Sequence, residues 1–341
     1  MSVKVAIVGA TGLVGQEAKR LAKELLAPFD AELVLFASTA RTTGDGFKVH
    51  ALESSGDLLN TCDYVLNAAG AEQALWVAER LGPKQVLVDN SSAFRMDAQV
   101  PLVVPEVNPE ALKNIPKRIV ANPNCTAAIL CVALKPLQPF GLDRVIVSTY
   151  QAASGAGITG LQELESQLEN WKNPPSTWST EVFGEPLLLN VLSHNSKVRP
   201  ESEAQGALYN DEEWKMVEET RKMLSQPDLW ISATCARVPV RRAHTESVTV
   251  DLAQDVSLQT LRELFKKADG VSYVDVPEER KFPSPQRAQD QDLVLVGRLR
   301  KDASRPKTLH MFISGDQLRK GAASNALQII RHHLQSQKGK G

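Results

Sequence analysis

The sequence predicts an α/β protein in which a doubly wound sheet comes first and a second, α+β domain follows. Three features of the chain support this fold class. Up to Cys125, short apolar runs alternate with helical patterns, as in sheets whose parallel strands are joined by crossover helices. The first apolar run ends in a glycine-rich turn. Beyond Cys125, apolar and polar residues alternate in a candidate strand, which favours an antiparallel sheet with one solvent-facing side.

The first domain is predicted to begin with a strand at residues 3–8. Its near-continuous apolar run suits a parallel strand covered on both faces. A helix reaching residue 26 or so is expected next. The same rhythm continues, with strands predicted at 32–36, 64–68, 85–89 and 118–121 and a helix at 71–81.

The second domain is predicted to mix strands with amphipathic helices. Val248, Val250 and Leu252 alternate with polar neighbours, which predicts one wet face. Residues 172–210 are rich in Pro, Ser and Asn and are expected to be mostly irregular. Strands are expected at 144–151, 230–238, 247–252, 271–276, 293–299 and 308–314, helices at 159–171, 212–224, 256–268 and 318–335, and a charged loop at 277–292.

The turn after the first strand has the spacing of a phosphate-binding turn. Gly9, Gly12 and Gly15 lie between a strand and a helix, where glycines let a pyrophosphate approach the backbone and the helix N-terminus binds it. A tight turn without a ligand also fits this pattern. The expected cofactor contacts from this Rossmann-like turn are Gly9, Thr11, Gly12, Leu13 and Val14.

The end of the second strand indicates which dinucleotide binds. An NAD site would call for an acidic residue there. Instead, Ser38, Arg41 and Thr42 follow the strand, and hydroxyl groups with a guanidinium suit a 2′-phosphate. The sequence therefore favours NADP as the cofactor, with a solvated loop arginine as the alternative.

Cys125 is the candidate nucleophile. It follows Pro123 and Asn124, and Asn124 suits the N-cap of an apolar helix that runs from Thr126. A thiol at a helix N-terminus has a lowered pKa and forms the nucleophilic thiolate more readily. A small buried cysteine that packs the turn is the alternative.

Composition excludes several other classes of function. The net charge is −1, which provides no field for nucleic acid or an anionic membrane. No apolar run is long enough to cross a bilayer, and a strand is expected directly at the N-terminus, which leaves no room for a signal peptide. The four cysteines lack the spacing of a zinc site or a disulfide framework. We therefore expect a cytoplasmic protein without a metal.

The glycine turn, residues 122–126 and residues 150–157 together resemble the aspartate-semialdehyde dehydrogenase family. Further blocks match in the family's order, at 89–95, 212–215, 237–244, 296–302 and 316–323, whereas residues 194–209 match poorly. The resemblance implies NADPH-dependent reduction of L-aspartyl 4-phosphate to L-aspartate 4-semialdehyde with release of phosphate, a step that feeds lysine, threonine and methionine biosynthesis. It also implies a homodimer or homotetramer, with an NADP-binding domain at 1–125 completed by a C-terminal helix at 318–341, and a catalytic and dimerisation domain at 126–317.

The family's catalytic roles fall on three residues of this chain. Cys125 resembles the nucleophile, His244 resembles the acid/base, and Gln151 resembles the residue that orients the acyl intermediate. The chemistry agrees, because a thiolate expels phosphate to give a thioester and a histidine exchanges protons near neutral pH. By pattern alone, His244 beside two arginines also fits a surface histidine at a strand end.

The family's binding roles fall on polar side chains in the other matching blocks. Arg237 resembles the arginine that holds the substrate carboxylate, and Glu212 resembles the acid that meets its amino group. By pattern alone, Glu212 and Lys215 also fit a solvent-facing ion pair on a helix. The implied substrate-binding residues are Arg95, Asn124, Glu212, Lys215 and Arg237, with Arg95 and Lys215 on the phosphate, and the implied further cofactor contacts are Gly155 and Asn325.

Two other functions remain open. N-acetyl-γ-glutamyl-phosphate reductase uses the same cysteine, histidine and NADPH on an acetylated substrate, which would not need Glu212. A non-catalytic relative of the same fold would have lost Cys125 or His244, and both are present.

Overall fold

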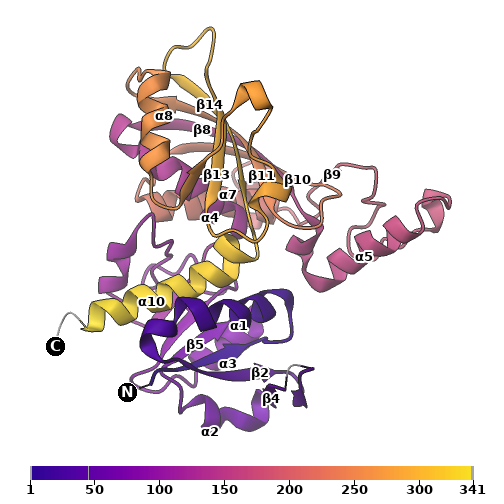
Figure 1. Cartoon of the computed structure of the whole chain (residues 1–341), viewed down its shortest axis with the longest axis vertical. Helices are drawn as coiled ribbons and strands as arrows, with labels where there is room; N and C mark the ends of the chain where they lie inside the picture. Colours follow the sequence, from indigo (N-terminus) through magenta and orange to yellow (C-terminus); the bar gives the residue numbers. More distant parts are fainter. Residues whose placement is uncertain (1, 45, 339–341) are drawn as a thin grey trace. The chain divides into compact units, whose positions relative to one another are not determined.

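The computed structural model describes residues 2–44 and 46–338, and the chain forms two compact units (Figure 1). Unit 1 comprises Met1–Asn124 and Gly321–Gly341, and unit 2 comprises Cys125–Lys320. Cys125 and residues 318–320, which were expected with the first domain, thus belong to unit 2. The last three residues of the expected helix 318–341 lie outside the described residues.

Unit 1 contains a sheet of seven described strands in the order β3-β4-β2-β1-β5-β6-β7. All neighbours are parallel except β3, which is antiparallel to β4. The strands are β1 Lys4–Val8, β2 Glu32–Ala37, β3 Arg41–Thr42, β4 Lys48–Ala51, β5 Tyr64–Asn67, β6 Val86–Asp89 and β7 Ile119–Ala121. The helices are α1 Leu13–Leu25, α2 Gly56–Leu59, α3 Ala71–Ala78 and α10 Ser324–Lys338. This is the doubly wound sheet that the sequence predicted.

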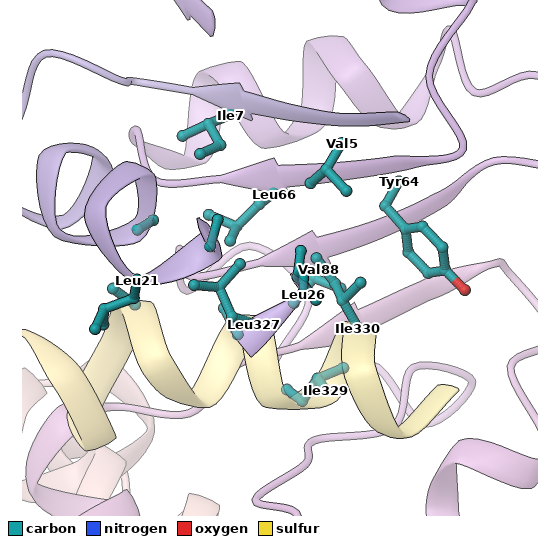
Figure 2. Packing of buried hydrophobic residues seen from close by; sticks show 14 of the residues in the cluster. Val5, Ile7, Leu21, Leu26, Tyr64, Leu66, Val88, Leu327, Ile329 and Ile330 are labelled. Atoms are coloured by element: carbon teal, nitrogen blue, oxygen red, sulfur yellow. The ribbon is translucent and has the colours of Figure 1, made fainter. Parts of the chain in front are cut away.

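The core of unit 1 joins the C-terminal helix to the N-terminal strands. Figure 2 shows Leu327 and Ile330 of α10 among side chains of β1, β5 and β6, next to Leu21 of α1. The alternate strand residues, such as Ala6 and Leu87, are also fully buried. Both faces of the sheet are therefore covered, which explains why these strands read as unbroken apolar runs.

Unit 2 contains a second sheet of seven described strands, in the order β12-β13-β14-β11-β8-β10-β9. It is mixed, because β8 and β10 are parallel whereas β11 is antiparallel to both β8 and β14. The strands are β8 Leu142–Gln151, β9 Leu192–Ser193, β10 Trp230–Arg237, β11 His244–Leu252, β12 Val271–Tyr273, β13 Val294–Lys301 and β14 Thr308–Gly315. The helices are α4 Cys125–Leu134, α5 Gly157–Glu169, α6 Pro200–Glu203, α7 Asp211–Leu224, α8 Leu258–Lys267 and α9 Pro285–Ala288.

The two faces of this second sheet differ. Along β8, Val145 and Val147 are buried, whereas Ile146 and Tyr150 between and beyond them are exposed. Helix α4 is buried along nearly its whole length and packs against α7, β13 and β14. One face therefore meets the helices, while the other carries exposed apolar side chains.

Several elements depart from the sequence pattern. Strands β3 and β4 were not expected, because they are short and largely polar. Strand β11 begins at His244 and not at residue 247. The sequence pattern missed this start because the buried positions His244 and Glu246 carry polar side chains. The C-terminal helix was expected to begin at residue 318, but a π-helical turn at Arg319–Ala323 precedes α10. The charged loop 277–292 contains the short helix α9.

Candidate active site

Cys125 is the first residue of α4, as the sequence predicted. It is partly exposed, whereas Cys62, Cys131 and Cys235 are buried. Burial raises the pKa of the Cys62 thiol to about 11 and raises the pKa of Cys131 and of Cys235 as well. Position and exposure therefore single out Cys125 as the cysteine that a substrate can reach.

The backbone of a single residue of unit 2, Ala152, holds two of the expected site residues. The N–H of Ala152 donates to Nδ1 of His244 at 3.0 Å, and the C=O of Ala152 accepts from Nη1 of Arg237 at 2.7 Å. A Cβ added to Gly155 would lie 2.8 Å from Nη1 of Arg237 and 2.9 Å from Cε1 of His244. Gly155 was expected to contact the cofactor, and the structure shows that it makes room for His244 and Arg237.

The turn after β8 is fixed to the segment that leads into β11. The N–H groups of Ala153 and Ser154 donate to the carbonyls of Val240 and Arg241. Gln317 donates to the Ser154 hydroxyl and accepts from the N–H of Ala243. His244 therefore sits on a turn held from both sides.

His244 is a neutral imidazole with a defined tautomer. Its side chain is fully buried, and burial, with Arg237 adding to the effect, lowers its pKa to about 3. A backbone N–H can only donate, so Nδ1 of His244 accepts and the ring proton lies on Nε2. Among the described residues, Nε2 has no hydrogen-bond partner. The surface-histidine alternative is excluded, and Nε2–H is available as a donor.

Arg237 and Gln151 are neighbours in the sheet, because β10 and β8 pair them directly. Burial lowers the pKa of the Arg237 guanidinium, while the charges of Glu212 and of a Cys125 thiolate act in the opposite direction. Cys125 and Arg237 are therefore within electrostatic reach of each other. Nε of Arg237 is buried without a described partner.

Glu212 lies in the first turn of α7 and is buried. It accepts a hydrogen bond from Nε2 of Gln151 at 3.1 Å, and Nζ of Lys215 lies 3.7 Å from its other oxygen. Lys215 also pairs with Asp211 at 2.5 Å. The i, i+3 ion pair of the alternative interpretation is thus present, but its carboxylate faces Gln151 and not the solvent.

His194 was missed by sequence reasoning. Its Nε2 lies 2.9 Å from Nη2 of Arg237, and Asn210, the N-cap of α7, donates to its carbonyl. It lies in the segment that matches the family poorly and was expected to be irregular. No sequence signal pointed to it.

The remaining substrate residues, Arg95 and Asn124, belong to unit 1. Nε and Nη2 of Arg95 donate to the carbonyls of Asn122 and Asn90 at 2.9 and 2.8 Å. Asn325 is fully buried and donates to Val103 and to the side chain of Asn122. These bonds fix the Asn122–Asn124 segment from two sides, so Asn325 has a structural role besides the cofactor contact expected for it.

The glycine turn of unit 1 borders a cavity of about 390 Å³. Gly9 has φ +79°, and a Cβ added to Gly15 would lie 2.2 Å from the carbonyl oxygen of Gly9. Helix α1 starts without a side-chain cap, so its first N–H groups can bind an anion. Among the predicted contacts, Gly9, Thr11, Gly12 and Ser38 line the cavity, whereas Leu13, Val14, Arg41 and Thr42 do not.

No group of three or more His, Cys, Asp or Glu side chains in the parts of the chain that the structure describes could hold a metal ion. No helix in the same residues is long and apolar enough to cross a membrane.

Known proteins of one family resemble this chain over nearly its whole length. A family model of the semialdehyde dehydrogenase NAD binding domain matches residues 4–115, and one of the dimerisation domain matches residues 134–320. The aspartate-semialdehyde dehydrogenase of Synechocystis sp. is 42% identical over 96% of each chain, and that of Aquifex aeolicus is 39% identical over 96% of this chain and 97% of the relative.

Solved structures of the same family also resemble this chain. The crystal structure of aspartate semialdehyde dehydrogenase II from Vibrio cholerae is 34% identical and has a TM-score of 0.89, covering 98% of this chain and 99% of its own. The same enzyme complexed with ASA matches with a TM-score of 0.88 over the same coverage.

Proposed function

The chain belongs to the aspartate-semialdehyde dehydrogenase family, and from this premise we propose that it reduces L-aspartyl 4-phosphate to L-aspartate 4-semialdehyde with NADPH, releasing phosphate. This is an oxidoreductase step of amino-acid biosynthesis. One observation carries the proposal for this chain: the backbone N–H and C=O of Ala152 hold a neutral histidine donor and an arginine that is in electrostatic reach of Cys125. The free cysteines suit the reducing cytoplasm, where we place the enzyme.

The first step uses the thiolate of Cys125. Its sulfur attacks the acyl carbon, the C–S bond forms, and the C–O bond to phosphate breaks with its electron pair leaving on phosphate. The N-terminus of α4 and the Arg237 guanidinium both stabilise the thiolate. Arg95 and Lys215 are the proposed cationic partners of the phosphate.

His244 was expected as an acid/base near neutral pH; because burial lowers its pKa to about 3 and Nδ1 is occupied by the Ala152 N–H, we propose instead that it donates a hydrogen bond to the oxygen of the acyl group. Negative charge develops on this oxygen in the acylation step and again when the thioester is reduced. Because its ring proton is on Nε2 and its pKa is far below neutrality, His244 can donate a hydrogen bond to the oxyanion at physiological pH without first gaining a proton. Gln151 lies between Thr149 and Glu212 and is proposed to orient the acyl group.

Unit 1 has the features that a dinucleotide needs. The uncapped start of α1 can bind the pyrophosphate, and Gly9 and Gly15 allow the close approach of backbone that this turn requires. When bound, NADPH supplies the hydride that reduces the thioester. Contacts of Leu13, Val14, Gly155 and Asn325 with the cofactor remain part of the proposal.

The proposal is tested by the reverse reaction. Purified protein with aspartate semialdehyde, inorganic phosphate and NADP⁺ should form NADPH, followed by its absorbance. Omission of phosphate should stop steady turnover, because the thioester then lacks its acceptor. A protein that binds NADPH but shows no turnover would be a non-catalytic relative.

The preference for NADPH over NADH gives a second test of the proposal, through a substitution of Arg41. The residues that line the cavity include the carboxylates Glu53 and Glu72 and no cation, so an added 2′-phosphate needs a positive charge from nearby. Arg41 is exposed on β3, shortly after Ser38. We expect Arg41→Ala to weaken NADPH binding by about 1.5–3 kcal/mol, the value of a charge-assisted hydrogen bond, and to leave NADH binding nearly unchanged. Titration of both cofactors by fluorescence measures this, and equal losses would remove Arg41 from the site.

The dimerisation domain model covers most of unit 2, and we propose that its open sheet face forms a homodimer. This face carries Ile146 and Tyr150 of β8 and Trp230 of β10, which are 36%, 37% and 50% exposed. Adjacent exposed apolar side chains on one sheet face are typical of a protein interface.

The homodimer gives a prediction for Ile146. A charge at this position costs little in a monomer, where the side chain already meets solvent, but would be buried and unpaired in the dimer. We therefore expect Ile146→Arg to shift the protein to a monomer in analytical ultracentrifugation. Leu75→Arg, at an exposed position on α3 of unit 1, is the matched control and should stay dimeric. A dimeric Ile146→Arg variant would place the interface elsewhere.

A further inference from the structure

The imidazole of His194 contacts the arginine that would hold the substrate carboxylate. The guanidinium of Arg237 has two acceptors in the described structure, the carbonyl of Ala152 at 2.7 Å and Nε2 of His194 at 2.9 Å. A guanidinium has only donors, so Nε2 of His194 must accept and the ring proton must be on Nδ1. Nδ1 lies 3.1 Å from the hydroxyl of Ser196, which can accept that proton, and 3.3 Å from the backbone N–H of Ser196, which competes for the same nitrogen as a donor. The 2.9 Å contact with the charged guanidinium is the shorter of the two donor contacts and therefore decides the tautomer.

The backbone around His194 is built to hold this contact. Ser193 and Leu192 of β9 pair with Ala236 and Arg237 of β10, and the N–H of His194 continues the ladder by donating to the carbonyl of Cys235. The hydroxyl of Ser196 accepts from the backbone N–H of Glu212. His194 is therefore tied both to the strand that carries Arg237 and to the helix that carries Glu212.

We infer that His194 is a positioning residue that fixes the orientation of the Arg237 guanidinium toward the substrate carboxylate, and that it does so only as a neutral imidazole. The inference rests on the proposed function and extends it to a residue outside the site that the sequence indicated. With Nη1 and Nη2 each holding one acceptor, the planar fork cannot rotate freely, and the buried Nε, which has no hydrogen-bond partner among the described residues, keeps its proton for the substrate. Precise placement of that carboxylate also places the reacting carbon.

The charges around His194 make the contact dependent on pH. Burial lowers the pKa of His194; Arg237 and Lys215 lower it further, while Glu212 and Asp211 raise it. The buried His244 also senses the charge of His194, which lowers its own pKa. His194 is thus neutral at pH values above a pKa that lies below the ordinary 6.5. As the pH falls through that value, an imidazolium can no longer accept from Arg237 and repels it.

The decisive experiment compares His194→Ala with His194→Gln. Removing the acceptor should raise KM for aspartate semialdehyde by about tenfold or more, with a smaller change in kcat and unchanged KM for NADP⁺. Gln offers an amide oxygen to Arg237, so His194→Gln should restore KM to within about threefold of the wild type and should lose the acid-side fall in kcat/KM. His332→Gln, at an exposed position on α10, is the control and should match the wild type.

A double variant shows whether His194 acts through Arg237. In the Arg237→Lys background, His194→Ala should have little further effect on KM, because the fork that it positions is gone. Additive effects would overturn the inference, as would an unchanged KM in His194→Ala or an equal rise of all Michaelis constants. Far-UV circular dichroism checks that the variants fold.

One readout does not need the substrate. ¹⁵N NMR of the histidine ring should show the Nδ1–H tautomer for His194, identified by its loss in His194→Gln. The Nε2–H tautomer would overturn the inference even if the enzyme is active. An inactive wild type with the Nδ1–H tautomer would instead count against the proposed function and leave the His194–Arg237 contact standing.

Discussion

Replacing Cys125 with Ala should abolish turnover and leave NADPH binding intact. The thiol is the only group of the proposed mechanism that bonds to the substrate, and loss of a catalytic nucleophile costs at least about ten-thousandfold in kcat. Cofactor affinity should not change, because the glycine turn and its cavity belong to unit 1, whereas Cys125 begins a helix of unit 2. Steady-state assays and cofactor titration measure the two effects separately.

The matched control is Cys62→Ala. Cys62 is buried in unit 1 and its thiol pKa is raised to about 11, so this variant should keep its turnover. In the wild type, iodoacetamide should alkylate mainly Cys125, because the three other thiols are buried and reluctant to ionise. Substrate should slow this labelling. Substantial activity in Cys125→Ala would end the covalent mechanism.

Much of this fold can be predicted from the sequence because burial determines how apolar residues are spaced along each strand and helix. The parallel strands of unit 1 are covered on both faces and read as apolar runs, and β8 of unit 2 alternates because one of its faces is open. The pattern failed where buried positions are polar, as at the start of β11, where His244 and Glu246 are completely buried. It also failed for β3 and β4, which are too short and polar to give a signal.

Only some residues of the candidate active site could be predicted from the sequence. Cys125 at a helix start follows from local sequence, because a proline and an asparagine precede an apolar helix. The contact of His194 with Arg237 depends on pairing with a two-residue strand, across a separation of 43 residues. Neither the hydrophobic pattern nor the secondary-structure propensity of the sequence predicts such a contact, because it forms only when β9 pairs with β10 in the folded protein. The same holds for the tautomer of His244, which a backbone N–H of a distant turn decides.

Selectivity for a free amino acid should depend on Glu212. In the proposed site its carboxylate meets the ammonium group of the substrate, and it is buried beside Gln151 with Lys215 at 3.7 Å. N-acetylglutamate semialdehyde is one methylene longer, lacks the positive charge and adds an acetyl group. It would leave the carboxylate in a closed site without the ammonium, a costly arrangement for a buried charge. We expect the wild type to prefer aspartate semialdehyde by at least about a thousandfold in kcat/KM.

Glu212→Gln should lower kcat/KM for aspartate semialdehyde and shrink this preference, because the amide keeps the shape of the side chain but not its charge. Glu218→Gln is the matched control on the same helix, where the carboxylate pairs with Arg221, and it should change neither value. Initial rates of NADPH formation with both semialdehydes, at saturating phosphate and NADP⁺, measure the ratio. If the wild type prefers the acetylated substrate, the proposed role of Glu212 and the proposed substrate are both wrong. The acyl-transfer chemistry of Cys125 and His244 would survive that result, because both substrates present the same acyl carbon to the thiolate and the same oxygen to Nε2–H.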